Sequence, residues 1–379
     1  MEQKKLLMMG QQQTFKEELA HSFYTNLPNN FGKENFDEDR FGAYPSTPLL
    51  QALKETVFSL LSTSVTKHRR DWLLESWLNR YGKGLETLYA SLEGDSKKLL
   101  VDIIAYRMLG FHKVKLPLNN PSYFKAIEDV KKLRDEKDFI NPNFLNLCLY
   151  KFHLKPLGYD LSLYFSDMAI VTDFVIEQYA QKQEGKTQVA TTAGDVVLDI
   201  GGCWGDTALY FADKAGPSGK VYSFEFIPNN IEIHKRNTAL NPNLQQRITL
   251  VEHPVSNVSD QTVFFKDFGP ASKIEIEPFD GQTGSVTTIS IDDFVERNNI
   301  EKVSFIKMDI EGAETMALQG AVRTITKFRP KLAIAIYHSM EDFINLPEWI
   351  SSLNLGYKFY LGHYTIHAEE TILFAKVDD

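Results

Sequence analysis

The chain has 379 residues, a formal net charge of −9 and 43% hydrophobic residues. Its length suffices for about two domain cores, and its negative charge argues against binding a nucleic acid backbone, which requires clustered Lys and Arg. Two cysteines are too few for a disulfide framework and favour a reducing compartment. Small molecules or glycans are therefore the expected partners.

The N-terminal segment is polar and rich in glutamine, and it lacks the pattern of a signal peptide. No uninterrupted apolar run reaches the length of a membrane span. We therefore expect a soluble, cytoplasmic protein without a membrane span.

The first part of the chain has apolar residues at helical spacing, from about Leu49 to Gln181. A polar loop, QKQEGKTQVATTAG, then leads into a run of a different period. The change of period predicts two parts. Residues 1–156 are expected to form a mostly helical N-terminal region, and residues 157–379 a second domain.

The second part alternates between strand-like and helix-like segments, which predicts a parallel sheet with helices on both faces. The expected parallel strands are Val196–Ile200, Val221–Phe226, Ile248–Glu252, Val303–Ile310 and Leu332–Tyr337. Two further runs, Lys358–Tyr364 and Thr371–Val377, are joined by a short loop and should form an antiparallel pair at the sheet edge. The fold class is therefore α/β, with five parallel strands, a reversed terminal hairpin and extra strands inserted after residue 260.

The turn after the first of these strands reads DIGGCWGDT and resembles a nucleotide-binding turn. A dinucleotide site has the spacing G-x-G-x-x-G, whereas Gly201, Gly202 and Gly205 give G-G-x-x-G. Asp206 then places a carboxylate at the helix start, where it would repel a phosphate. The expected ligand is an adenosine with a cationic centre, and S-adenosylmethionine is such a molecule. Asp199 can face its positive charges.

A second acid supports an adenosine ligand. Glu225 ends the next strand, twenty positions after Gly205, where an Asp or Glu takes the two ribose hydroxyls in doubly wound folds. The alternative is that Asp199 and Glu225 are strand-end acids in solvated loops.

Several blocks of the second part resemble one known family. These are DIGGCWGDT, VYSFEFIPNNIEIHKRNTALN, TTISIDDF, FIKMDIEGAETMALQGA and RPKLAIAIYH. They are similar to the successive blocks of the FkbM-type S-adenosylmethionine-dependent methyltransferases, from about Val196 to His338. The resemblance implies a seven-strand, Rossmann-like methyltransferase fold with a reversed final hairpin. It also implies methyl transfer to a hydroxyl, commonly on a sugar or a polyketide-like product.

The candidate site lies at the carboxyl ends of the strands, where open α/β sheets bind ligands. The expected cofactor-binding residues are Asp199, Gly201, Gly202, Gly205, Asp206, Thr207, Glu225, Phe226 and Glu252. The strand FIKMDIE also carries Lys307, Asp309 and Glu311 at a spacing of two, which places them on one face of an extended strand. The alternative for Lys307 is a structural ion pair with Asp309 or Glu314.

His338 and Asp309 are the predicted catalytic residues. A sugar hydroxyl is too weak an acid to ionise at neutral pH, and a neutral imidazole is the side chain best suited to accept its proton. Asp309 could orient the ring of His338, or the two residues could hold Mg²⁺. No residues are assigned as metal ligands from spacing alone.

Competing hypotheses remain for the reaction. The methyl group could go to nitrogen or carbon instead of oxygen, or the fold could be a catalytically silent binding module. A nicotinamide dehydrogenase fits least well, because of the glycine spacing and Asp206. The segment GPASK, residues 269–273, is interpreted as a connecting turn, with closure over the acceptor as the alternative.

Overall fold

The computed structural model describes residues 13–44, 63–144, 147–183 and 185–378. The chain divides into two compact units. The first contains the described residues up to Asn119 together with Thr365–Ala368, and the second contains Asn120–Tyr364 and the described residues from Glu369 onward. Each unit is described by itself. The expected helical positions between residues 45 and 62 lie outside the described residues.

The first unit is helical, as expected. Its main helices are α2 (Phe15–Asn26), α5 (Thr63–Ser91) and α6 (Ser96–Leu109), with short turns η1 (Lys33–Asn35) and α3 (Glu38–Phe41). Helix α2 begins at Thr14, whose hydroxyl accepts the backbone N–H of Glu17 while the Glu17 carboxylate accepts that of Thr14. Helix α2 packs against both α5 and α6. Among the described helices, none is both long and apolar enough to cross a membrane.

The second unit begins with helix α7 (Pro121–Lys131) and a small antiparallel sheet. This sheet has the order β1 (Arg134–Ile140), β2 (Leu149–His153) and β3 (Ser162–Phe165). The helical pattern expected in this part of the chain is interrupted after Lys131, because Arg134, Asp135, Phe139 and Ile140 pair with β2. Helix α7 contacts α8 (Asp167–Ile170), and β3 contacts α10 (Pro228–Ala239). The division between the two units falls between Asn119 and Asn120.

The main sheet of the second unit is mostly parallel, as expected from the alternating segments. Its strands are β6 (Val196–Ile200), β7 (Lys220–Phe224), β8 (Ile248–Val251), β12 (Phe305–Met308), β13 (Lys331–Ala335), β14 (Lys358–His363) and β15 (Thr371–Lys376). The described strands pair in the order β14-β15-β13-β12-β6-β7-β8. The five strands from β13 to β8 run parallel, and β15 pairs antiparallel with both β13 and β14.

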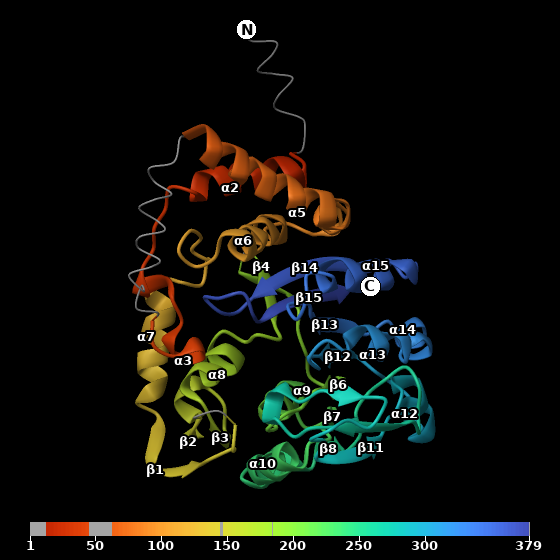
Figure 1. Cartoon of the computed structure of the whole chain (residues 1–379). Coiled ribbons are helices and arrows are strands. Elements are labelled where there is room, and N and C mark those ends of the chain that lie inside the picture. Colours follow the sequence, from red (N-terminus) through yellow and green to blue (C-terminus); the bar gives the residue numbers. More distant parts are fainter. Residues whose placement is uncertain (1–12, 45–62, 145–146, 184, 379) are drawn as a thin grey trace. The chain divides into compact units, whose positions relative to one another are not determined.

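Helices cover the main sheet on two sides (Figure 1). Helix α9 (Asp206–Ala215) packs on β6, β7 and β8, and α11 (Pro242–Gln245) packs on α9. On the other side, labelled at the right of Figure 1, lie α12 (Ile291–Arg297), α13 (Glu314–Gln319), α14 (Val322–Phe328) and α15 (Asp342–Ser352). Residues 314–328 contain the two helices α13 and α14. Gly320 separates them and lies against the backbone of Ser256, so a side chain there would collide with it.

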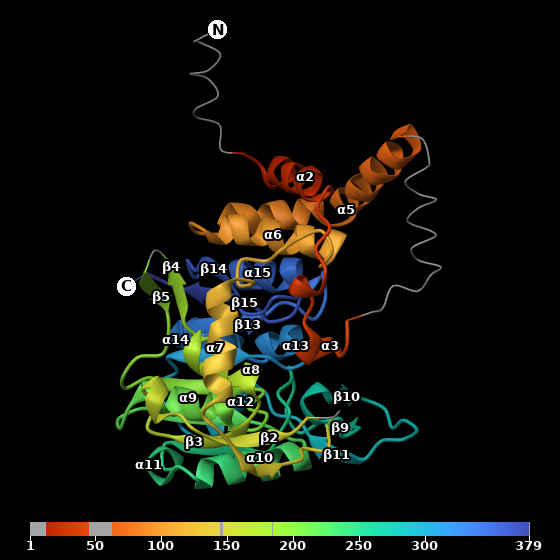
Figure 2. The same ribbon diagram turned by 90° about the vertical axis from the view of Figure 1, so that its left-hand side faces the viewer.

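Two insertions complete the second unit. Strands β9 (Thr262–Phe265), β10 (Ile274–Glu275) and β11 (Gly284–Thr287) form a separate antiparallel sheet between β8 and α12, with the turn η4 (Gly269–Ala271) between β9 and β10. Figure 2 shows this small sheet at one side of the unit, away from α11. Before β6 lie the turns η2 (Lys155–Leu157) and η3 (Val171–Val175) and the hairpin β4 (Gln181–Gln183) and β5 (Lys186–Val189).

Candidate cofactor and acceptor site

A cavity of about 270 Å³ lies where the carboxyl ends of β6, β7, β8 and β12 meet. Its walls come from the turn after β6, the segment 253–256 after β8, the segment 309–313 after β12, and the insertion that contains η4. Four predicted site residues line it: Gly201, Glu225, Phe226 and Asp309. The ends of parallel strands meet at one edge of a sheet, which is why residues far apart in the sequence share this cavity.

The other predicted residues do not line the cavity: Asp199, Gly202, Gly205, Asp206, Thr207, Glu252 and His338. Glu252 is the most distinct of them, because its carboxylate is half-exposed and forms an ion pair with Lys235 at 2.5 Å. Such a pair on the surface contributes little. The remaining residues are buried or nearly buried and lie outside the lining of the cavity.

Asp199 is buried beneath the glycine turn and is fully engaged there. Its side chain is 0% exposed and lies 3.3 Å from the Nζ of Lys307, which is 2% exposed. Its oxygens also accept hydrogen bonds from the hydroxyls of Thr207 and Ser223. The buried partner of Lys307 is therefore Asp199, not Asp309 or Glu314 as the ion-pair alternative supposed.

Lys307 ties the strand β12 to the glycine turn. Its ammonium also donates to the carbonyl oxygen of Gly201. Burial alone lowers the pKa of Lys307, but attraction to Asp199, Asp309 and Asp206 outweighs it and raises the pKa above its usual value. Lys307 stays charged and neutralises part of an acidic interior.

The glycines of the turn permit close backbone contacts. Gly201 has φ +88°, and a Cβ at this position would lie 2.0 Å from the carbonyl oxygen of Asp309. A Cβ at Gly202 would lie 1.9 Å from the hydroxyl of Ser223. The turn therefore packs directly against β12 and β7, and only glycine fits at these two positions. Gly205 precedes α9 as its N-cap.

Asp206 begins α9 and lies beside a second buried acid, Asp173 in η3. Burial raises the pKa of Asp206 to about 6, and burial together with Asp206 raises the pKa of Asp173 well above its usual range. Each of the two carboxyl groups thus disfavours the ionisation of the other. The carboxyl group of Asp206 therefore lies beside Asp173 in the interior and does not line the cavity.

Glu225 stands at the other end of the cavity, after β7. One of its oxygens accepts the backbone N–H groups of Phe226 and Ile227, and the other accepts the side-chain amide of Asn230 at 3.2 Å. Burial raises the pKa of Glu225 to about 7. These contacts fix the carboxyl group at the wall of the cavity, where it can accept hydroxyl donors.

Asp309 follows β12 and is held by two phenols. The hydroxyl of Tyr337 donates to it at 3.1 Å and that of Tyr179 at 3.5 Å. Tyr337 also lies 3.4 Å from the buried carboxyl of Glu370, whose pKa is raised to about 8 by burial and by Asp309. The strand ends at Met308, and Glu311 has φ +57°, so the expected alternation of three charges on one face stops before Glu311.

The sequence-based prediction missed several residues of the cavity wall. His253, Asn230, Lys273 and Cys203 line it. The Nδ1 of His253 lies 2.8 Å from the carbonyl oxygen of Thr287, and this contact holds the ring beside the cavity. The GPASK segment was interpreted as a connecting turn, and four of its five residues line the cavity. In the sequence, His253 directly follows a predicted strand and precedes Pro254. This position alone was too weak a signal to place His253 in the site.

Comparison with known proteins assigns the domain. Residues 191–359 match the model of the methyltransferase FkbM domain. This part of the chain is an FkbM methyltransferase domain. This FkbM domain contains the glycine turn, Glu225, Asp309 and His338, and the family is one of S-adenosylmethionine-dependent methyltransferases. No curated protein sequence matches the chain.

Solved structures resemble this chain weakly. Methyltransferase FkbM from Methylobacillus flagellatus KT aligns at 20% identity and a TM-score of 0.48, over 80% of this chain and 62% of that one. This chain thus spans less than two thirds of that protein. Fibrillarin from Aeropyrum pernix, solved with natively bound S-adenosyl-L-methionine, aligns at 15% identity and a TM-score of 0.32, over 60% of this chain and 93% of that one. A putative O-methyltransferase from Klebsiella pneumoniae aligns at 12% identity and a TM-score of 0.31, over 76% of this chain and all of that one.

The residues of the FkbM domain suit the family's cofactor. Gly201 of the glycine turn lines the cavity, and Glu225 lines it as well. Asp309 and Glu311 line the same cavity, and burial raises the pKa of Glu311. Acidic groups at both ends favour a ligand with hydroxyl donors and a positive centre, which S-adenosylmethionine has.

Proposed function

We propose that this protein transfers the methyl group of S-adenosylmethionine to a hydroxyl of a sugar, glycan or natural product. The observation that carries the proposal is one cavity lined by Glu225, which follows β7, and by Asp309 and Glu311, which follow β12 on the other side of β6. Glu225 would take the ribose hydroxyls, and the acids at the far end would face the sulfonium. The acceptor hydroxyl would then lie near Asp309.

The chain's own residues would contribute mainly positioning. Methyl transfer needs the acceptor oxygen, the methyl carbon and the sulfur in line, and holding reactants in such a geometry lowers the barrier by several kcal/mol. The two phenols that hold Asp309 limit the movement of its carboxylate. In this proposal Asp309 faces the hydroxyl, and His338, whose Nε2 lies 3.4 Å from Asp309, completes the group that activates it.

The acceptor would enter beside the η4 insertion. Gly269, Pro270 and Lys273 line the cavity, and the adjoining hollow of about 500 Å³ is lined by Phe268, Phe279 and charged residues. An aromatic ring beside polar side chains suits a sugar, whose ring has an apolar face and a hydroxylated edge. Lys273 contributes to both hollows, which links the cofactor end to the acceptor end.

Mg²⁺ was a second possibility from the sequence, and the donors here do not suit it. Mg²⁺ requires near-octahedral coordination by oxygen and keeps several waters. The carboxylates nearest His338 surround an imidazole, which is a nitrogen donor. We therefore route no step of the methyl transfer through Mg²⁺.

The proposal is tested with methyl-labelled S-adenosylmethionine and fractionated pools of glycans and metabolites. We expect label in a hydroxyl-bearing acceptor, as a methyl ether that survives mild alkali. Label found only on nitrogen or carbon would contradict the O-methyl assignment. Absence of transfer to every pool, with S-adenosylmethionine bound, would contradict the enzymatic proposal itself.

A pH dependence is expected for S-adenosylmethionine binding. The ionised carboxylate of Glu225 accepts two hydroxyl donors better than the neutral acid does, and its pKa is raised to about 7 by burial. Affinity should therefore rise as pH increases through 7 and fall by up to about tenfold per unit below it. Calorimetric titrations from pH 6 to pH 8 measure this dependence.

Glu225→Gln supplies the variant for that titration. It should bind about tenfold more weakly at pH 8 and lose most of the dependence on pH, because an amide does not ionise in this range. Glu232→Gln, on the exposed face of α10, is the matched control and should behave like the unmodified protein. A Glu225→Gln titration that keeps the full pH dependence would refute the role of Glu225.

A further inference from the structure

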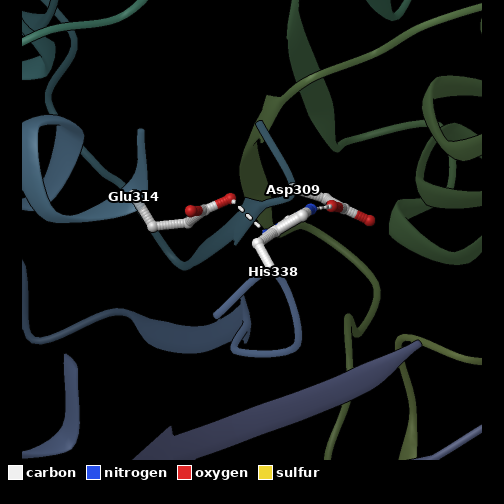
Figure 3. A group of neighbouring side chains, drawn as sticks. All are labelled: Asp309, Glu314 and His338. Atoms are coloured by element: carbon white, nitrogen blue, oxygen red, sulfur yellow. Dashed lines mark ion pairs between the residues drawn. The ribbon is translucent and has the colours of Figure 1, made fainter. Parts of the chain in front are cut away.

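Three side chains from three elements meet at one point (Figure 3), and one of them, Asp309, lines the cavity. Asp309 follows β12, Glu314 begins α13 and His338 follows β13. One potential ligand atom of each lies within 4.8 Å of the others. The Nε2 of His338 lies 3.4 Å from Asp309, and its Nδ1 lies 3.4 Å from Glu314.

The polar atoms of this cluster are buried and incompletely satisfied. The side chain of His338 is only 10% exposed, and neither ring nitrogen makes a hydrogen bond to any residue that the structure describes. Glu314 is 1% exposed. Its Oε1 accepts the backbone N–H of Ile310, while Oε2 has no hydrogen-bond partner within the described part of the chain. Buried polar atoms without partners are costly, so such a group points to a missing ligand.

The charge around His338 defines the sign of that ligand. Besides Asp309 and Glu314, the carboxylate of Glu311 lies 3.9 Å from Nε2. Three carboxylates thus surround one imidazole. The nearby buried cation Lys307 is already engaged by Asp199 and the Gly201 carbonyl. A positive ligand at the cluster would therefore reduce the repulsion among its acids.

We propose that Asp309, Glu314 and His338 bind a divalent first-row transition-metal ion of the Mn²⁺ type. Carboxylate oxygens suit Mg²⁺, Ca²⁺ and Mn²⁺, but an imidazole nitrogen favours the transition metals among divalent ions. The ligand atoms would close from their present separations to about 2.0–2.2 Å from the ion. Glu311 is near enough to supply a further oxygen.

The ion would stand next to the reacting groups. Asp309 and Glu311 both line the cavity, so an ion held by Asp309 would lie at its wall. This catalytic part rests on the proposed methyl transfer: a hydroxyl bound to the ion loses its proton more readily. The binding of the ion does not depend on that proposal and can be measured without S-adenosylmethionine.

The test is a titration of metal-stripped protein with Mn²⁺. The protein is dialysed against EDTA and then against metal-free buffer, and binding is followed by calorimetry and by loss of the electron paramagnetic resonance signal of free Mn²⁺. We expect one ion per chain. Absence of binding by the unmodified protein would overturn the proposal, and so would displacement of bound Mn²⁺ by an equal concentration of Mg²⁺.

Two variants separate the ligands from the fold. Glu314→Gln keeps an oxygen for the Ile310 N–H but loses the carboxylate, and His338→Ala loses the nitrogen donor. Each should weaken Mn²⁺ binding by at least about tenfold. Glu296→Gln, an exposed carboxylate in α12, is the matched control and should leave it unchanged. Unchanged Mn²⁺ affinity in both cluster variants would overturn the assignment.

Titration with S-adenosylmethionine keeps the two proposals apart. Variants that bind S-adenosylmethionine normally but not Mn²⁺ support the metal site on a folded protein. Mn²⁺ binding without any methyl transfer would contradict the proposed function and leave the metal site intact. Methyl transfer at full rate by EDTA-stripped protein that binds no Mn²⁺ would contradict the metal site and leave the proposed function intact.

Discussion

Replacing His338 with alanine should lower the turnover of methyl transfer by about a hundredfold or more. The side chain lies directly behind Asp309, with its Nε2 3.4 Å from the carboxylate, and not in the cavity itself. The affinity for S-adenosylmethionine should stay nearly the same, because Glu225 and the glycine turn are untouched. Initial rates with labelled S-adenosylmethionine and calorimetry on the same protein measure both quantities.

The control for this variant is His153→Ala. His153 is an exposed residue of β2 whose ring contacts the hydroxyl of Ser162, and its loss should leave turnover unchanged. This control separates a general effect of removing any histidine from the specific effect of removing His338. Turnover in His338→Ala close to that of the unmodified protein would show that hydroxyl activation does not require His338.

The second large effect is expected on stability. Lys307→Met should lower the free energy of unfolding by about 3 kcal/mol, because it leaves the buried carboxylate of Asp199 without its cation. For a unit of this size the melting temperature should fall by roughly 6–12 °C. Binding of S-adenosylmethionine should also weaken, because the Gly201 carbonyl loses its ammonium donor. Thermal unfolding followed by circular dichroism measures the change in stability.

Lys331→Met is the matched control for Lys307→Met. Lys331 is also the lysine of a parallel strand and pairs with Asp195 at 2.8 Å, but its side chain is 26% exposed. The Asp195 carboxylate keeps the backbone N–H and the hydroxyl of Thr192 as donors, and the Lys331 ammonium is partly solvated, so the loss should stay near 1 kcal/mol or below. Adding Asp199→Asn to Lys307→Met should recover part of the lost stability. Equal losses in the two single variants would contradict the importance of burial at Lys307.

The strands of the main sheet followed well from the sequence. Short β-branched runs such as Val196–Ile200 were located correctly, because a strand buried on both faces is apolar throughout. The site edge followed from the rule that ligands bind at the carboxyl ends of parallel strands. Gly201, Glu225 and Asp309 accordingly line the observed cavity.

The partners of the site residues did not follow from the sequence. Lys307 pairs with Asp199 because β12 and β6 are neighbours in register, Lys307 opposite Asp199, and the order of strands is a property of the whole sheet. Asp206 lies beside Asp173, which precedes it by 33 positions and comes from the π-helical turn η3. Local sequence patterns carry no information about contacts between distant residues. The sequence analysis therefore related Asp206 to a bound ligand, whereas in the structure its carboxyl group lies beside the buried Asp173.

Residues on irregular segments were also missed. His253 and the segment 269–273 reach the cavity through loops whose course depends on the β9–β11 sheet. The strand after Lys131 was mistaken for helix, since alternating charges in RDEKD fit an exposed helix as well as an edge strand. Pairing with β2 decides between them, and it is a tertiary contact.

The central claim is that the cavity between Glu225 and Asp309 binds S-adenosylmethionine, and calorimetric titration of the full chain tests it most directly. We predict one S-adenosylmethionine per chain, competition by S-adenosylhomocysteine, and no heat with NAD under the same conditions. S-adenosylmethionine should bind in preference to NAD, because the acids of the cavity wall repel a pyrophosphate and the glycine spacing differs from that of a dinucleotide site. No binding of S-adenosylmethionine at millimolar ligand, or binding of NAD in its place, would contradict the account.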